Sequence, residues 1–245
     1  MQDRGLAAYV AELVGTLLLV FIIGTVFTLY VATSANAQTG SDFAVVGLTA
    51  GFTLFILVMA LGTVSGGHFN PVVTLAAAVL RRLDPVDAAV YILAQLSGGV
   101  LGALMLKGFL LDEGRAGHYG AVSVSTILGH DRLGGLIEGI GAFLLVLAYV
   151  SVAYNARARE WTPLNYAFAY GLTLGVVTMV FAPLTGAAVN PARWFGPALI
   201  GNHFANTWPY LVGPVVGALV AAGVFRLVVW GPGTEREGRA GSPSG

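Results

Sequence analysis

Long stretches of this chain contain no charged side chain. Residues 13–41, 43–80, 161–192 and 194–225 lack Asp, Glu, Lys and Arg, and residues 88–106 form a shorter stretch of the same kind. A helix that spans a bilayer needs about 20 predominantly apolar residues. The longest stretches exceed one span and fall short of two. The pattern therefore predicts a membrane protein that also contains short helices inside the membrane.

The pattern predicts an all-α membrane protein with six transmembrane helices and two re-entrant half-helices. The spans are expected at 8–31, 43–64, 86–108, 132–154, 164–182 and 208–230, and the half-helices at 70–80 and 190–200. The polar segment 111–130 is expected to be an aqueous loop. Residues 1–230 are predicted to form one domain. The tail 231–245 is rich in Gly, Ser and charge, and is predicted to be disordered and cytoplasmic.

Each predicted half-helix begins with an Asn-Pro dipeptide inside apolar sequence. The two tripeptides are Asn70-Pro71-Val72 and Asn190-Pro191-Ala192. Asn is a preferred N-cap, and Pro suits the first helical position because its missing N–H is not needed there. Two helices therefore start where a bilayer requires every backbone polar group to be satisfied. Half-helices that meet at the midplane and line a polar path solve this problem.

The two halves of the chain are related by a repeat, expected to cover residues 8–110 and 132–230. The block that begins at Glu12 matches the block at Glu138, the block at Gly51 matches that at Gly171, and the block at Gly98 matches that at Gly213. Each half holds three spans, so the halves must have opposite topology. Inverted repeats with broken helices place a solute site near the midplane.

Composition narrows the possible functions. The chain has 245 residues, of which 56% are hydrophobic and 10% charged, and its formal net charge is +0. A nucleic-acid partner therefore has no electrostatic support. There is no cysteine, and His118, His130 and His203 are too scattered along the sequence to suggest a metal site. No catalytic set of residues can be assembled, so the sequence predicts neither an enzyme nor a cofactor.

The distribution of basic residues predicts the orientation. With both termini inside the cell, the cytoplasmic side would hold Arg4, Arg81, Arg82, Arg157, Arg159, Arg226, Arg236 and Arg239, and the outer side only Lys107, Arg115 and Arg132. Cytoplasmic loops of membrane proteins carry an excess of Lys and Arg. We therefore expect a multi-pass protein of the cell membrane with cytoplasmic termini.

With its two Asn-Pro motifs, its paired glutamates and its internal repeat, the chain closely resembles the aquaporin and aquaglyceroporin superfamily. The similarity extends over about residues 8–230, and its signatures are residues 65–75 (SGGHFNPVVTL) and 190–199 (NPARWFGPAL). It implies a homotetramer with one pore per subunit. The first motif has Val72 where Ala is usual, as is common in plant nodulin-26-like members.

The resemblance also assigns a selectivity constriction. Counting from the two asparagines places it at Ala50, Thr178, Ala187 and Arg193. Water-selective members typically have Phe and His at the first two positions, so small residues there imply a wider aperture. This set most resembles that of nodulin-26-like channels, which pass uncharged hydroxylated solutes such as glycerol, urea and boric or arsenous acid.

An alternative is that a bulky neighbour fills the space in front of the small constriction residues. The candidates are Phe52, Phe181 and Trp194. We can assign no other role to Trp194 from the sequence.

Further residues are expected to complete the pore. The amides of Asn70 and Asn190 should donate hydrogen bonds to a passing solute, beside two positive half-helix ends that repel cations and protons. The resemblance implies that Glu12 and Glu138 accept hydrogen bonds from the re-entrant loops, although a proton relay is an alternative. His68 is expected at the cytoplasmic mouth, where it braces the loop. The lining carbonyls are expected to be those of Gly66, Gly67, His68, Phe69, Gly186, Ala187, Ala188 and Val189.

These features predict a passive channel for water and small uncharged hydroxylated solutes that excludes ions and protons. Three alternatives remain open. The first is a water-selective channel with little solute flux. The second is a secondary transporter built on inverted repeats, and the third is a structural junction protein with the same fold.

Overall fold

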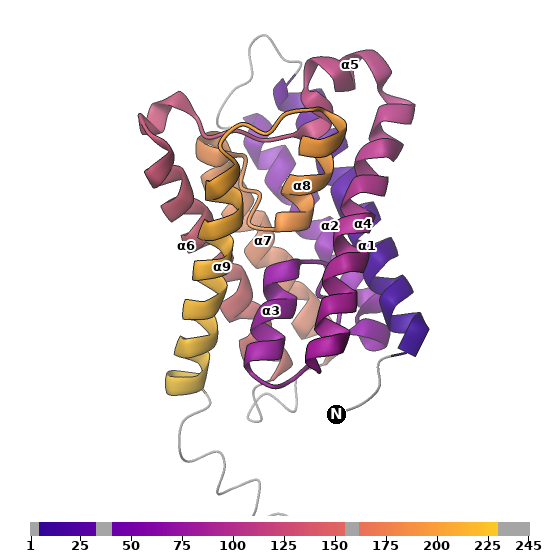
Figure 1. Ribbon diagram of the computed structural model, residues 1–245, viewed down its shortest axis with the longest axis vertical. Coiled ribbons are helices and arrows are strands. Elements are labelled where there is room, and N and C mark those ends of the chain that lie inside the picture. Colours follow the sequence, from indigo (N-terminus) through magenta and orange to yellow (C-terminus); the bar gives the residue numbers. More distant parts are fainter. Residues whose placement is uncertain (1–4, 33–40, 155–161, 230–245) are drawn as a thin grey trace, which may run out of the picture.

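The fold is a bundle of long helices around two short ones (Figure 1), seen in a computed structural model that describes residues 5–32, 41–154 and 162–229. The long helices are α1 (Gly5–Phe27, continued by η1, Thr28–Ala32), α2 (Ser41–Ser65), α4 (Pro85–Phe109), α6 (Asp131–Ala153), α7 (Pro163–Thr185) and α9 (Thr207–Val224, continued by η5, Phe225–Val229). The short ones are α3 (Pro71–Val79) and α8 (Pro191–Ile200). In the described part of the chain, six helices are long and apolar enough to cross a membrane. The predicted fold class is confirmed.

One predicted loop contains more structure than expected. Residues 111–130 include α5 (Leu111–Ala116), η2 (His118–Gly120) and η3 (Thr126–Leu128). The predicted tail 231–245 and the arginines at 4, 157, 159, 236 and 239 lie outside the described residues.

The two short helices enter the bundle from opposite ends (Figure 1). Helix α3 lies in the lower half of the view and α8 in the upper half, and the start of α1 and the end of η5 lie at the α3 end. Both short helices begin as their sequences predict. Asn70 and Asn190 are N-caps with extended backbone, and each is followed by a proline at the first helical position. The ends that carry the asparagines therefore face each other inside the bundle.

Glycines let the long helices pack in two equivalent pairs. A Cβ built on Gly98 of α4 would lie 2.4 Å from the carbonyl oxygen of Leu13 in α1. In the second repeat, a Cβ on Gly213 of α9 would lie 2.4 Å from the carbonyl oxygen of Gly135 in α6. Small residues that let backbones approach are typical of helix packing in membranes. Close backbone contacts at glycines therefore join a pair of long helices in each half.

Helix α8 is held against α4 by a glycine contact of its own. A Cβ on Gly99 would lie 2.3 Å from the carbonyl oxygen of Ala192, and one on Gly196 would lie 2.1 Å from the carbonyl oxygen of Gly99. No side chain fits at either position unless the backbones move apart. This contact fixes how deep the second half-helix sits.

We predict that Gly99→Ala destabilises the protein by about 1–3 kcal/mol, because an added methyl group must push α8 away from α4. Thermal unfolding of the purified protein in detergent measures the effect. Gly108→Ala on the same helix is the matched control, since a Cβ there meets nothing within 4 Å. Equal unfolding temperatures for the two variants would contradict the proposed contact.

Candidate functional site

Glu12 of α1 holds the loop that precedes α3. Its Oε1 accepts hydrogen bonds from the Ser65 hydroxyl (2.7 Å) and the His68 backbone N–H (2.9 Å). Its Oε2 accepts from the Phe69 N–H (2.7 Å) and the Gln95 amide (2.7 Å). The side chain is 0% exposed. Both oxygens are therefore engaged in fixing the loop.

Glu138 of α6 holds the loop before α8 in the same way. Its Oε1 accepts from the Thr185 hydroxyl (2.6 Å) and the Ala188 N–H (3.0 Å), and its Oε2 accepts from the Val189 N–H (2.6 Å). The sequence-derived expectation for both glutamates corresponds to these contacts. A proton relay would need a carboxylate oxygen free to face the path, and these oxygens face the loops.

Both loops contain non-glycine residues in the left-handed region of backbone conformation. The φ angles are 47° at Phe69, 45° at Ala187 and 43° at Val189. Such a conformation costs about 1–3 kcal/mol per residue and persists only where surrounding contacts enforce it. At Phe69 and Val189, the enforcing contact is the hydrogen bond from the backbone N–H to the glutamate.

His68 lies deeper than expected. We predicted it at the cytoplasmic mouth, but it is 1% exposed, with Nδ1 2.9 Å from the hydroxyl oxygen of Thr74. Its ring packs edge-on against Tyr91 and Tyr149. The burial follows from the loop backbone, which Glu12 draws into the bundle. His68 therefore braces the loop from within.

Asn70 and Asn190 meet where the two half-helices face each other. Nδ2 of Asn70 donates to the Val189 carbonyl (3.0 Å), and Nδ2 of Asn190 donates to the Phe69 carbonyl (2.8 Å). Their Oδ1 atoms cap their own helices. A side-chain amide has two N–H donors, so each asparagine keeps one that these contacts do not use.

Arg193 lies on α8, one turn beyond Asn190. It is 3% exposed, and its Nη1 donates to the Gly120 carbonyl (2.8 Å). Its guanidinium carbon lies 5.9 Å from the centre of the Phe27 ring. Among the described residues, Nη2 has no hydrogen-bond partner. The arginine is thus held inside the protein with spare donor capacity.

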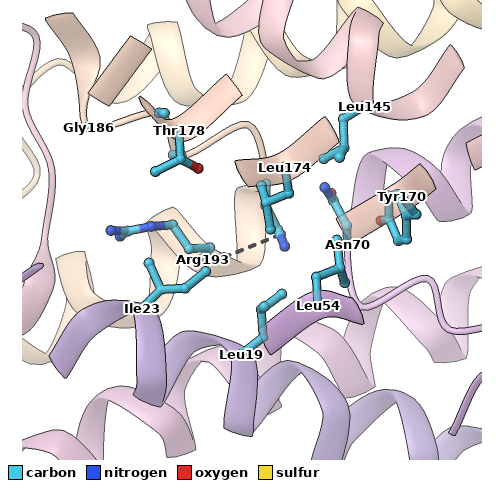
Figure 2. A pocket seen from close by; sticks show the side chains of 13 residues that line it. Leu19, Ile23, Leu54, Asn70, Leu145, Tyr170, Leu174, Thr178, Gly186 and Arg193 are labelled. Atoms are coloured by element: carbon cyan, nitrogen blue, oxygen red, sulfur yellow. Dashed lines mark hydrogen bonds between the residues drawn. The ribbon is translucent and has the colours of Figure 1, made fainter. Parts of the chain in front are cut away.

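A narrow cavity connects these groups (Figure 2). Donor groups of Arg193, Asn190 and Asn70 line it, together with Thr178, Tyr170, residues 186–188 and a set of apolar side chains. The apolar residues are Leu19, Ile23, Leu54, Leu145 and Leu174. Arg193 and Thr178 lie at one end, and Asn70 and Tyr170 at the other.

Three of the four residues expected at the constriction lie at this cavity. Thr178, Ala187 and Arg193 line it, but Ala50 does not, and it is 0% exposed. The longer side chains of Ile23 and Leu54 line the cavity instead. Ala50 is therefore a buried packing residue.

The bulky residues considered from the sequence do not fill this space. Phe52 is 61% exposed on the outside of α2, and Phe181 packs beside Phe43 without lining the cavity. Trp194 is 3% exposed and lies nearly parallel to Tyr210, with ring centres 6.2 Å apart. Its place is in the packing of α8 against α9. Ile23 of α1, which the sequence did not suggest, lines the cavity instead.

The predicted lining carbonyls differ between the two loops. Gly186, Ala187 and Ala188 line the cavity, and within the described ranges no side chain donates to their carbonyls. On the α3 side, the Gly66 carbonyl accepts hydrogen bonds from the hydroxyls of Tyr149 (3.0 Å) and Tyr166, and the His68 carbonyl accepts from Tyr170 (2.9 Å). We call Tyr149, Tyr166 and Tyr170 the tyrosine cluster. Their hydroxyls bind to carbonyl oxygens that we expected to face the path.

Comparison with known proteins identifies the family. The model of the family described as "Major intrinsic protein" matches residues 2–225. The chain belongs to the major intrinsic protein family. Members of this family are passive channels, so the protein is a multi-pass membrane channel and not an enzyme.

Relatives within the major intrinsic protein family carry different functional names. The chain is 33% identical over 226 residues to glycerol uptake facilitator protein-like 6 of Lactiplantibacillus plantarum, covering 90% of this chain and 97% of the relative. It is 33% identical over 220 residues to nodulin-26 of Glycine max, covering 89% and 76%. The structure of the aquaglyceroporin from Plasmodium falciparum matches the fold with a TM-score of 0.80 at 21% identity, covering 91% and 96%.

Two features of this channel were missed in the sequence: the lining residue Ile23 and the tyrosine cluster. The repeat relates these positions to each other. The alignment that pairs Glu12 with Glu138 also pairs Ile23 with Tyr149, and the alignment that pairs Gly51 with Gly171 pairs Ala50 with Tyr170. Applying the repeat to the predicted constriction residue Ala50 points to Tyr170. What the repeat does not indicate is which side chain reaches the path.

We predict that Glu138→Gln destabilises the protein by about 1.5–3 kcal/mol, the usual range for a hydrogen bond to a charged group. An amide cannot accept on both of its ends, so one donor of the loop loses its partner. The thermal unfolding temperature and the water flux measured by stopped flow should both fall. Glu113→Gln on the exposed face of α5 is the control, and full stability of Glu138→Gln would refute the bracing role.

Proposed function

We propose that this protein is a passive, bidirectional channel for water and small uncharged hydroxylated solutes that excludes ions and protons. The observation that carries this proposal is the cavity that runs from Arg193 past both asparagines. Glycerol, urea and boric or arsenous acid are the solute candidates. Each has oxygen atoms that can accept hydrogen bonds from these donors, and each is uncharged at neutral pH.

The mixed lining supports selective passage of neutral polar molecules. Arg193, Asn190 and Asn70 offer hydrogen-bond donors to the cavity, and leucine and isoleucine side chains form its apolar walls. A neutral solute replaces part of its hydration with these donors. An ion would lose far more hydration energy against the apolar wall. The arginine charge and the half-helix ends add positive potential against cations and protons.

A water-selective channel with little solute flux is the second candidate. It is favoured by the wall of Ile23 and Leu54, which narrows the space that Ala50 alone would leave open. The relatives named above do not decide between the candidates, because identities near 33% do not specify a solute.

A secondary transporter is less well supported. A coupled transporter needs a carboxylate that faces the transported solute or ion. Glu12 and Glu138, the two buried glutamates in the described residues, both have their oxygens bound to the loops. Flux that rises linearly with the solute gradient would fit a channel, and saturation would fit a transporter.

Two further proposals follow from the family and the sequence. We propose that the protein forms a homotetramer with one pore per subunit, in the cell membrane. We also propose that both termini are cytoplasmic, which places Arg81, Arg82 and Arg226 on the inner side. Chemical cross-linking in membranes and sided proteolysis would test these points.

We predict that proteoliposomes with the wild-type protein pass water, glycerol, urea and boric acid faster than empty liposomes in stopped-flow light scattering. Proton flux, followed with an enclosed pH dye, should equal that of empty liposomes. Arg193→Ala should admit a measurable proton or cation leak, because it removes the fixed positive charge. Wild-type flux of water alone would favour the second candidate, and absence of all flux would reject both.

We predict that Ile23→Ala raises glycerol and boric acid flux more than water flux, because it shortens a side chain that lines the cavity beside Arg193. Ile23→Phe should have the reverse effect. Phe52→Ala is the control, since Phe52 points outward from α2. If Ile23→Ala leaves the ratio of solute to water flux unchanged, Ile23 does not define the aperture.

A further inference from the structure

The tyrosine cluster separates the cavity from a second hollow at the α3 end of the bundle. This hollow has an empty volume of about 810 Å³ and is lined by residues that include Val58, Gly66, Tyr149 and Tyr166. None of its lining residues also lines the cavity around the asparagines. Tyr170 lies at the end of that cavity, beside Asn70 and opposite Arg193 (Figure 2). The tyrosines therefore stand between the two spaces.

The three tyrosine rings pack against one another as well as against the loop. Tyr149 lies edge-on to Tyr166 and to Tyr170, with ring centres 5.5 Å and 5.1 Å apart. Tyr149 and Tyr170 are each 1% exposed. Together with the hydroxyl contacts to the Gly66 and His68 carbonyls, this packing gives the rings one defined position across the path.

The internal repeat shows what the tyrosines correspond to. Tyr170 is the counterpart of Ala50, and Tyr149 is the counterpart of Ile23, which lies beside Arg193 at the other end of the cavity (Figure 2). Val58 and Thr178 are likewise counterparts, and each lines the space in its own half. The two halves thus carry equivalent narrow points, with aromatic rings only in the inner one.

We propose that Tyr149, Tyr166 and Tyr170 form a second, inner constriction that limits the rate and the solute size of this channel. The proposal rests on the channel function proposed above. A passing molecule must part the rings and replace the hydroxyls at the Gly66 and His68 carbonyls. Water and hydroxylated solutes can do so because they donate to a carbonyl while accepting from a phenolic hydroxyl.

Sided thiol labelling tests the barrier independently of flux. The chain has no cysteine, so single cysteines can be introduced at Leu54 and Val58, which lie one turn apart on α2 and line the two different spaces. A membrane-impermeant, uncharged hydroxylated methanethiosulfonate is added from the α3 side, so that the positive potential near the asparagines does not itself exclude the reagent, and labelling is measured by mass spectrometry.

We expect Val58→Cys to react and Leu54→Cys to stay unlabelled. Combining Leu54→Cys with Tyr170→Ala should make it react. Labelling of Leu54→Cys with the tyrosines intact would overturn the proposal. So would failure of Tyr170→Ala to expose it.

Stopped-flow measurements test the effect on conduction. Tyr170→Phe removes the donor to the His68 carbonyl, and we expect water flux to rise about fivefold, the factor that corresponds to one net hydrogen bond. Tyr170→Ala should in addition raise glycerol flux relative to water. Tyr9→Phe is the matched control, because this tyrosine also donates one hydrogen bond, to Asp87 (2.6 Å), away from the path.

Equal flux in wild type and both Tyr170 variants would overturn the inner constriction while leaving the channel function intact. An equal rise in Tyr9→Phe would also overturn it. If the labelling pattern holds but no variant conducts any solute, the constriction stands and the proposed function fails.

Discussion

The structure depends on satisfying backbone polar groups in two loops that lie inside the membrane. A bilayer offers no water to an unpaired N–H, and each such group costs several kcal/mol. Glu12 and Glu138 meet this demand by accepting hydrogen bonds from residues 68 and 69 and from residues 188 and 189. Because each accepts several hydrogen bonds from its loop, the glutamates hold a backbone that would otherwise relax away from its left-handed turns.

The braced loops determine where the functional groups point. Because the chain is fixed up to Asn70 and Asn190, the two half-helices begin at defined places and their N-termini face each other. The asparagine amides then bridge the loops by donating to the Val189 and Phe69 carbonyls. A polar stripe of donors results, without any ionised acceptor in the path, opposite a wall of aliphatic side chains.

The repeat is nearly symmetric in its supports and asymmetric in its constrictions. The glutamates, the capping asparagines and the paired glycines have close counterparts in both halves. Arg193, in contrast, corresponds to the fully buried Val73, and Ala50 corresponds to Tyr170. The α8 end of the path therefore carries charge and aliphatic side chains, and the α3 end carries tyrosine rings. An inverted repeat can thus build one path with two chemically different narrow points.

The sequence by itself determined the six spans, the two half-helices, the inverted repeat and the pairing of asparagines. These features follow from local rules: charge-free length, the N-cap preference of Asn, the fixed φ of Pro and the order of matched blocks. The resemblance to the family, by counting from its two motifs, also pointed to Thr178, Ala187 and Arg193.

Only the tertiary structure decided which side chains reach the path. Ile23 and Leu54 line the cavity whereas Ala50 does not, and His68 is buried. The carbonyls of Gly66 and His68 are taken by tyrosines that lie more than 80 positions away along the chain. Whether a residue lines a cavity depends on the lengths and rotamers of neighbours from other helices. Such contacts join distant parts of the chain, and spacing within one segment carries no information about them.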